Sequence, residues 1–266
     1  MSTVATRLGP LHVEVDGDGP PAVLWPSLFV DSTTWTRLRP ALAAVRRLIL
    51  VDGPGHGRSG RPPESFTMDD CQAAAGDVLD RLGITGPVDW LGNAWGGHTG
   101  LAFAAAQPDR VRTVLTIGTP VSALPEGERR SIRLGYAVHR LLGPRPVATV
   151  VADALLGGGY RKSDPEAARI VVAGFVRSDR PGMRAAIRSI SLDRTDATGL
   201  LPQVKAPTLM VTGADDASCS PADTAAWAAL IPNGQHRVVP GAGHVAPLFD
   251  PATADVIAQF WADGTS

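Results

Sequence analysis

Short apolar runs alternate with helical patterns along most of this chain of 266 residues. The runs begin at residues 11, 22, 47, 88, 111, 207 and 236 and read LHVEV, AVLW, RLILVD, VDWLG, VRTVLTIG, PTLMVTG and HRVVPG. The first run, LHVEV, alternates between apolar and polar residues, whereas runs such as AVLW are continuously apolar, which is typical of strands buried on both faces of a sheet. The helical patterns between them cover residues 34–45, 67–83, 95–107, 220–231 and 250–263. Strands that alternate with helices predict an α/β fold, in which helices flank a mostly parallel central sheet.

Residues 121–202 depart from this alternation. They hold four helical patterns and no run typical of a strand, at residues 127–143, 146–158, 164–178 and 179–192. Prolines near the starts of these patterns and glycines near their ends are typical helix boundaries. We therefore predict a helical cap at 121–202, inserted into a core formed by 1–120 and 203–266 and lying over the carboxyl edge of the sheet. The cap carries more basic than acidic residues, which fits either a solvated surface or an attraction for anionic substrates.

Composition and charge argue against several classes of protein. The chain is 44% hydrophobic and 19% charged, with a formal net charge of −1, so we expect neither nucleic acid nor an anionic membrane as a partner. No apolar stretch is long enough to span a membrane, and the first residues lack the apolar core of a signal peptide. Cys71 and Cys219 show neither CxxC nor metal-ligand spacing. We therefore expect a cytoplasmic protein without a structural disulfide.

Neither a metal nor a cofactor is expected from the motifs. No histidines and carboxylates share metal-ligand spacing. GHGRSG lacks the lysine of a phosphate-binding loop, and GNAWGGHTG does not fit the glycine pattern of a dinucleotide site.

The segment GNAWGG, residues 92–97, joins a predicted strand to a predicted helix by a tight turn. A residue at the apex of such a turn has strained backbone angles, so the residues two positions to either side need almost no side chain. Gly92 and Gly96 satisfy that requirement around Ala94. The N-terminus of the following helix directs N–H groups toward the apex, where negative charge would be stabilised. The turn is thus built to present a reactive side chain, yet alanine has no nucleophilic atom.

Four motifs in this order resemble the α/β-hydrolase fold over nearly the whole chain. AVLWPSLFVDSTTW (22–35) is similar to the oxyanion strand and loop, LVDGPGHGRSGRP (50–62) to the D-x-P-G-x-G-x-S turn, and GNAWGG to G-x-S-x-G. VTGADD (211–216) and PGAGHVAPLFDP (240–251) are similar to the acid and histidine turns. The resemblance implies a Ser-His-Asp type of site in which Ala94 occupies the nucleophile position.

Further residue roles follow from the same resemblance. His244 would be the general base, oriented by Asp216, with Asp215 as the alternative acid. The oxyanion hole would consist of the backbone N–H groups of Leu28 and Trp95. Pro26 and Ser27 replace the family's usual His-Gly in the first of these loops.

The resemblance also suggests the wall of a substrate pocket. Trp25 and Phe29 would stand near the apex, with Tyr136 and His139 contributed by the cap; ordinary core packing is the alternative for each. A mostly apolar pocket under a helical cap suggests a medium-sized, moderately hydrophobic ester or lactone as the substrate.

Three interpretations account for alanine at position 94. The first is an ester or lactone hydrolase whose nucleophile has been replaced, which leaves the fold intact and removes the covalent step. The second is an enzyme that uses His244 and Asp216 as a general base without a nucleophile. The third is a non-catalytic protein that binds ligand in the same pocket. Asn93, Ser27 and Cys219 are not persuasive substitutes for a nucleophile.

Overall fold

The structure, a computed structural model, describes residues 2–264 and contains one sheet of eight strands in the order β1-β2-β4-β3-β5-β6-β7-β8. The strands are β1 (Ser2–Thr6), β2 (Gly9–Asp16), β3 (Pro21–Trp25), β4 (Arg47–Val51), β5 (Val88–Asn93), β6 (Val111–Ile117), β7 (Thr208–Gly213) and β8 (Gly234–Val239). From β4 to β8 all neighbouring strands are parallel, whereas β1 and β2 form an antiparallel edge. The α/β prediction with a mostly parallel sheet is confirmed.

Strand β1 was not expected from the sequence. Only Val4 is buried in it, so it lacks the apolar run that marks the central strands. Pairing with β2 along its whole length, from Ser2 opposite Val13 to Thr6 opposite Gly9, holds it at the edge.

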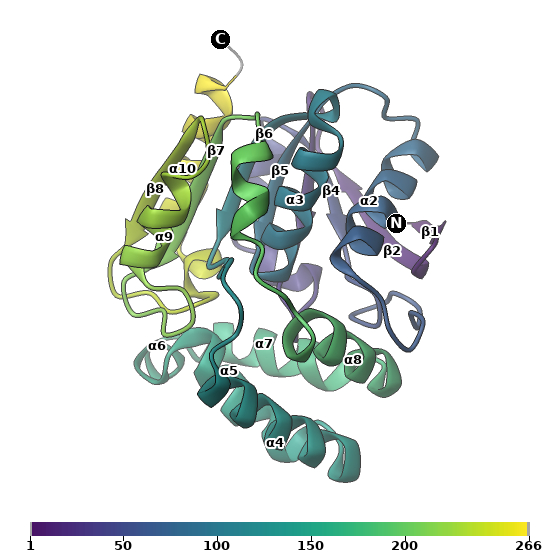
Figure 1. The fold of residues 1–266 in the computed structure, drawn as a ribbon, viewed down its shortest axis with the longest axis vertical. Coiled ribbons are helices and arrows are strands. Elements are labelled where there is room, and N and C mark those ends of the chain that lie inside the picture. The colour runs from purple at the N-terminus through teal and green to yellow at the C-terminus, as the bar shows by residue number, and fades with distance from the viewer. Residues whose placement is uncertain (1, 265–266) are drawn as a thin grey trace.

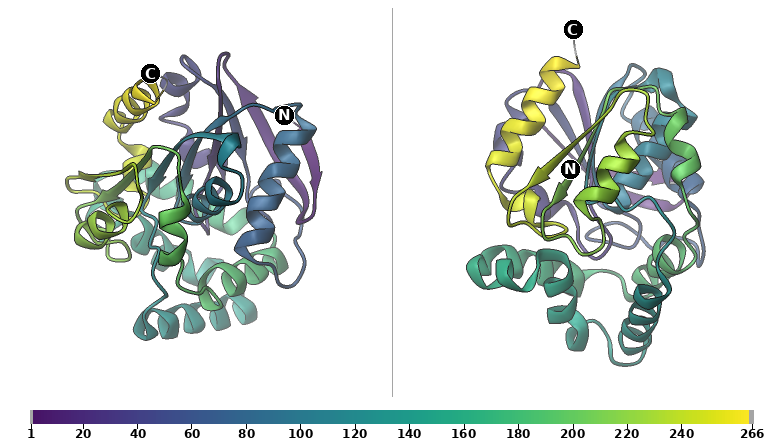
Figure 2. Two further views of the ribbon diagram at one scale, coloured as in Figure 1. Left: turned by 45° about the horizontal axis from the view of Figure 1, so that its top comes forward. Right: turned by 60° about the vertical axis from the view of Figure 1, so that its left-hand side comes forward.

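Two hydrophobic clusters cover the two faces of the sheet. One contains residues of α2 (Met68–Arg81), α3 (Trp95–Ala106) and α9 (Pro221–Ala228), and the other contains residues of α1 (Arg39–Ala43) and α10 (Ala252–Asp263). Figures 1 and 2 show this three-layer arrangement, and in the right-hand view of Figure 2 the sheet lies between α10 (yellow) and α9 (yellow-green). All six residues of β5 are buried, as expected of a strand covered on both faces.

The helix expected over residues 34–45 is divided in the structure. A 3₁₀ turn, η1 (Ser32–Trp35), precedes the short helix α1, and Pro40 lies in the first turn of α1. Proline is tolerated there, but in the interior of a longer helix it would remove a hydrogen bond and clash with the preceding turn.

Five helices gather beyond the carboxyl ends of the strands, where Figures 1 and 2 show them as a separate layer. They are α4 (Glu126–Leu142), α5 (Ala148–Leu156), α6 (Gly158–Ser163), α7 (Pro165–Arg177) and α8 (Arg180–Ala186). Asp164 and Asp179 cap α7 and α8 with their side chains. Helix α6 was not expected, and α8 continues into a π-helical segment, η4 (Ile187–Leu192).

Helix α4 presents an unexpected face to solvent. The apolar residues Leu134 and Leu141 share a helical face but are 69% and 77% exposed. The opposite face packs inward, with His139 buried and Ile132 and Tyr136 against the core. Within residues 2–264, no helix combines the length and apolar character needed to cross a membrane.

Candidate active site

The turn between β5 and α3 forces Ala94 into an unusual backbone conformation. Its φ and ψ are 45° and −102°, a region that residues with a side chain rarely adopt. The two flanking glycines make the turn possible. A Cβ on Gly92 would lie 2.2 Å from the carbonyl carbon of Gly96, and a Cβ on Gly96 would lie 1.8 Å from the carbonyl oxygen of Trp25. These distances agree with the expectation that the residues two positions to either side of Ala94 need almost no side chain.

We expect Gly96→Ala to destabilise the fold severely. The added methyl group would meet the backbone of β3, which cannot move without breaking the sheet, so we expect a loss of several kcal/mol, about what overpacking costs at its upper end. The matched control is Gly135→Ala in α4, where a Cβ meets nothing within 4 Å. There we expect a gain of about 0.5–1 kcal/mol from helix propensity. Thermal unfolding of both variants checks the pair, and equal melting temperatures would contradict it.

His244 and Asp216 face each other from two loops at the carboxyl edge of the sheet. The loop after β7 carries Asp216 and the loop after β8 carries His244, and the distance from Nδ1 to Oδ2 is 2.9 Å. The other carboxylate oxygen, Oδ1, accepts hydrogen bonds from the N–H groups of Ser218 and Cys219 at 2.9 and 3.1 Å. Asp216 is buried, whereas Asp215 is exposed. The carboxylate is thus fixed in place and orients the imidazole.

Asn93, next to the apex, supports the histidine loop rather than the cavity. Its side-chain amide donates to the carbonyl oxygen of Ile117 at 2.8 Å and, more weakly, to that of His244 at 3.4 Å. It is fully buried and is not among the residues that line the cavity described below.

A hydrogen bond to His56 fixes the loop that follows β3. Phe29 has a positive φ of 76°, and its N–H donates to Nε2 of His56 at 3.2 Å. Nδ1 of His56 lies 2.9 Å from the carbonyl oxygen of Pro54 and donates to it, so the imidazole is neutral. His56 thereby holds the loop in its strained shape. Within the described residues, the N–H groups of Leu28 and Trp95 have no hydrogen-bond acceptor.

A cavity of about 640 Å³ brings these groups together. It is lined by five of the expected site residues, namely Leu28, Phe29, Ala94, Trp95 and His244. The other three expected wall residues lie elsewhere. Trp25 is fully buried behind Trp95, with ring centroids 6.1 Å apart; His139 packs against Phe175, and Tyr136 against the hydrophobic core. For these three, core packing prevails over a place in the pocket, because their helix or strand turns them toward other side chains.

The wall of the cavity also includes ionisable residues that the sequence did not assign to it. Glu128 of α4 and Arg194, which follows η4, both line it, as does His98 of α3. Burial raises the pKa of Glu128, and the charge of Arg194 acts in the opposite direction. The excess of basic over acidic residues in 121–202 was the one sequence feature that indicated charged groups at the cavity, and it does not identify any single residue. Among residues 2–264, no group of three metal-ligating side chains was found.

Buried histidines should make the fold sensitive to acid. Burial lowers the pKa of His56, and burial together with Arg194 lowers the pKa of His98 to about 3. The unfolded chain takes up these protons near pH 6.5 and the folded chain only at lower pH, so stability is complete above 6.5 and falls as pH decreases. From pH 7.5 to 5, His98 alone should remove about 2 kcal/mol from the free energy of unfolding.

Urea unfolding at the two pH values measures this loss. His98→Gln, which keeps an N–H donor but takes up no proton, should reduce the difference, whereas His236→Gln on the exposed strand β8 should not. A free energy of unfolding that is equal at both pH values would contradict the prediction.

Comparison with known proteins shows the family to which the chain belongs. Residues 20–251 match the family model described as the alpha/beta hydrolase fold, so the chain belongs to that family. It is 28% identical to the pimeloyl-[acyl-carrier protein] methyl ester esterase of Xanthomonas oryzae pv. oryzae over 88% of this chain and 91% of that protein.

Two solved structures are similar over almost their whole length. A thermophilic esterase from Thermogutta terrifontis, solved with malate bound, has a TM-score of 0.91 and 27% identity, covering 100% of this chain and 99% of that one. The enol-lactonase from Burkholderia xenovorans has a TM-score of 0.89 and 25% identity, covering 98% of this chain and 100% of that one.

Proposed function

We propose that the chain has the active site of a carboxylic ester or lactone hydrolase in which Ala94 replaces the nucleophile. One observation carries the proposal: Ala94, at the strained apex, lines the same cavity as His244, whose Nδ1 is held by Asp216 at 2.9 Å. The relatives described above include esterases and an enol-lactonase, which supports an ester or lactone as the substrate.

The roles of the residues follow from this geometry. With the hydroxyl introduced by Ala94→Ser, Nε2 of His244 would take the hydroxyl proton while the oxygen attacks the substrate carbonyl. Negative charge would develop on the carbonyl oxygen, where the N–H groups of Leu28 and Trp95 stabilise it. Asp216 would hold the imidazole in the correct tautomer and stabilise the imidazolium. His244 would then protonate the leaving alcohol and activate the water that releases the acid.

The division of the chain into two parts belongs to the same proposal. Residues 1–120 and 203–266 would form the hydrolase core, and residues 121–202 the cap. Helix α4 and segment η4 support this division, because Glu128, Ile132 and Ile190 line the same cavity as Ala94 and His244 of the proposed core.

A second candidate function needs no substitution. Nε2 of His244 has no hydrogen-bond partner among the described residues, and it lines the cavity. Because alanine leaves space at the apex, a water molecule activated by His244 could attack the substrate directly. Turnover by the unmodified chain that His244→Ala abolishes would favour this function. Ligand binding that is unchanged by His244→Ala and Asp216→Ala, without turnover in any variant, would instead indicate a binding protein.

The experiment that tests the main proposal is Ala94→Ser, assayed on panels of esters, lactones and amides. Hydrolysis by this variant supports the proposal, and inactivity across all three panels overturns it.

A further inference from the structure

Arg194 is a largely buried cation without an anionic partner. It lies on the segment that returns from η4 to the core, and it lines the cavity that contains Ala94 and His244. Its Nη2 donates to the carbonyl oxygen of Ser122 at 3.0 Å, while its Nε is buried without any acceptor. Within residues 2–264, no carboxylate lies within 4 Å of its guanidinium. Burying an arginine in this way is costly unless something else satisfies its donors.

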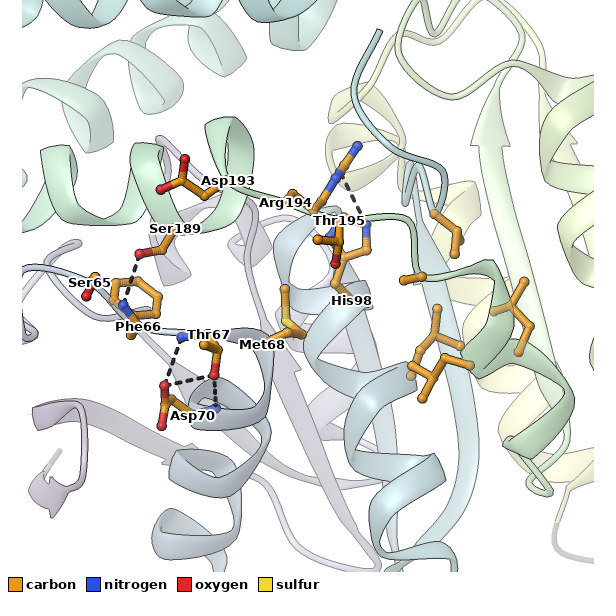
Figure 3. A pocket seen from close by; sticks show the side chains of 15 residues that line it. Ser65, Phe66, Thr67, Met68, Asp70, His98, Ser189, Asp193, Arg194 and Thr195 are labelled. Atoms are coloured by element: carbon orange, nitrogen blue, oxygen red, sulfur yellow. Dashed lines mark hydrogen bonds between the residues drawn. The ribbon is translucent and has the colours of Figure 1, made fainter.

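His98 does not supply the missing acceptor. Its Nε2 lies 2.7 Å from the carbonyl oxygen of Pro120 and 3.4 Å from Nη1 of Arg194. A contact of 2.7 Å to a carbonyl oxygen requires the proton on Nε2, so this nitrogen has no lone pair for Arg194. Figure 3 shows the guanidinium beside the His98 ring, on the chain that leaves η4.

The nearby acids leave Arg194 unpaired as well. Asp196 accepts hydrogen bonds from the N–H groups of Thr198 and Ala123, at 2.9 and 3.3 Å. Glu128 interacts with Arg194 through its charge, but the two side chains form no ion pair within 4 Å. Arg129, also near, adds positive charge of its own. Among the described residues, the guanidinium of Arg194 therefore keeps N–H groups that no carboxylate accepts, and the residue lines the cavity.

The local backbone suggests that this position is specifically shaped. The N–H of Asp193 donates to the carbonyl oxygen of Arg188, five residues back, at 2.8 Å. Such π-helical turns are rare and occur often at functional sites. Arg194 follows this turn directly and also borders a second cavity of about 510 Å³, shown in Figure 3, whose wall includes Phe66, Met68 and Leu101. Arg194 and His98 thus line both cavities.

We propose that Arg194 binds a carboxylate on the substrate, so that the site selects esters or lactones that carry a free carboxyl group. This inference rests on the proposed function and adds the substrate class. A planar guanidinium can donate two parallel hydrogen bonds to a carboxylate, and the burial of Arg194 would strengthen them. The mostly apolar remainder of the cavity would hold the chain between the carboxylate and the scissile carbonyl.

The test uses two esters that differ only in charge, monomethyl adipate and dimethyl adipate, and measures their binding to the unmodified chain by calorimetry at pH 7.5. Because the Ala94 chain lacks the nucleophile, binding is measured without the acyl-enzyme step. We expect the half-ester to bind roughly tenfold more tightly than the diester. Equal affinities, or no binding of the half-ester, would overturn the inference.

Substitutions of Arg194 test whether this side chain causes the preference for the half-ester. Arg194→Gln should remove the tenfold preference, so that the half-ester binds no more tightly than dimethyl adipate. The matched control is Arg188→Gln, an exposed arginine of η4 outside both cavities, which should behave like the unmodified chain. An unchanged preference in Arg194→Gln would overturn the assignment. If that variant does not fold, Arg194→Lys, which keeps the charge and loses the planar fork, should show a reduced preference, and a full preference there would overturn it.

The proposed function and this inference can fail separately. Ala94→Ser is assayed on the same two esters: hydrolysis of the diester with no higher kcat/KM for the half-ester would overturn the carboxylate site and leave the hydrolase proposal standing. Hydrolysis of neither ester nor of any other ester, lactone or amide would overturn the hydrolase proposal itself.

Discussion

Ala94→Ser is expected to raise the rate of ester hydrolysis by a factor on the order of 10⁴ or more, because alanine occupies the nucleophile position of the proposed site. The residue that gains the hydroxyl already stands at the apex of the turn, at φ 45°, and lines the same cavity as His244. Replacing alanine by serine adds a single oxygen where the cavity is open. Initial rates on p-nitrophenyl acetate and γ-butyrolactone measure the effect.

A matched control tests whether the gain in rate depends on where in the cavity the hydroxyl group is placed. Ala123 also lines the cavity, and Ala123→Ser adds the same group away from the apex, so we expect no gain in rate. A fluorophosphonate probe gives a second readout, because it should attach covalently to Ala94→Ser and to neither the unmodified chain nor Ala123→Ser. A folded Ala94→Ser variant that the probe does not label would show that the apex and His244 do not act together.

Asp216→Asn in the Ala94→Ser background is expected to lower kcat by about 10⁴-fold. The amide can still accept the hydrogen bonds from Ser218 and Cys219, so the loop should keep its shape. It carries no charge to stabilise the imidazolium, and its NH₂ group can hold His244 in the wrong tautomer. Steady-state kinetics together with a melting temperature close to that of the parent variant check this expectation.

Asp215→Asn is the matched control, since it makes the same chemical change one residue away. Asp215 is exposed, and the carboxylate at 2.9 Å from His244 belongs to its neighbour, so we expect kcat within about twofold of the parent. Equal losses in the two variants would mean that the general charge of the loop matters, and not the pairing of Asp216 with His244.

The predictions from sequence succeeded where the pattern is local. The run at 88–92 became a fully buried β5, and the proline near residue 164 marks the true start of α7. The steric argument for Gly92 and Gly96 needed only the spacing of residues along the chain. Strand β1 was missed because a half-exposed edge strand has no continuous apolar run.

Sequence reasoning was weaker for the wall of the cavity. Tyr136 and His139 lie on α4 as expected, but the direction in which α4 turns them depends on how the helices of residues 121–202 pack together. The same packing exposes Leu134 and Leu141, which a helical pattern alone would bury. Arg194 could not be recognised either, because it is distinguished only by lacking a partner, and partners are set by residues distant in the chain.

The sequence by itself determined the alternation of strands and helices, the tight turn at Ala94 and the residue types available for catalysis. These depend on backbone sterics and on periodicities of two to four residues, which are properties of neighbours along the chain. Only the tertiary structure decided that Asp216, and not Asp215, meets His244, and that no carboxylate among residues 2–264 forms an ion pair with Arg194. Such choices depend on loops and helices that fold together from separate parts of the chain, where a rotation of one residue moves a side chain from the cavity into solvent.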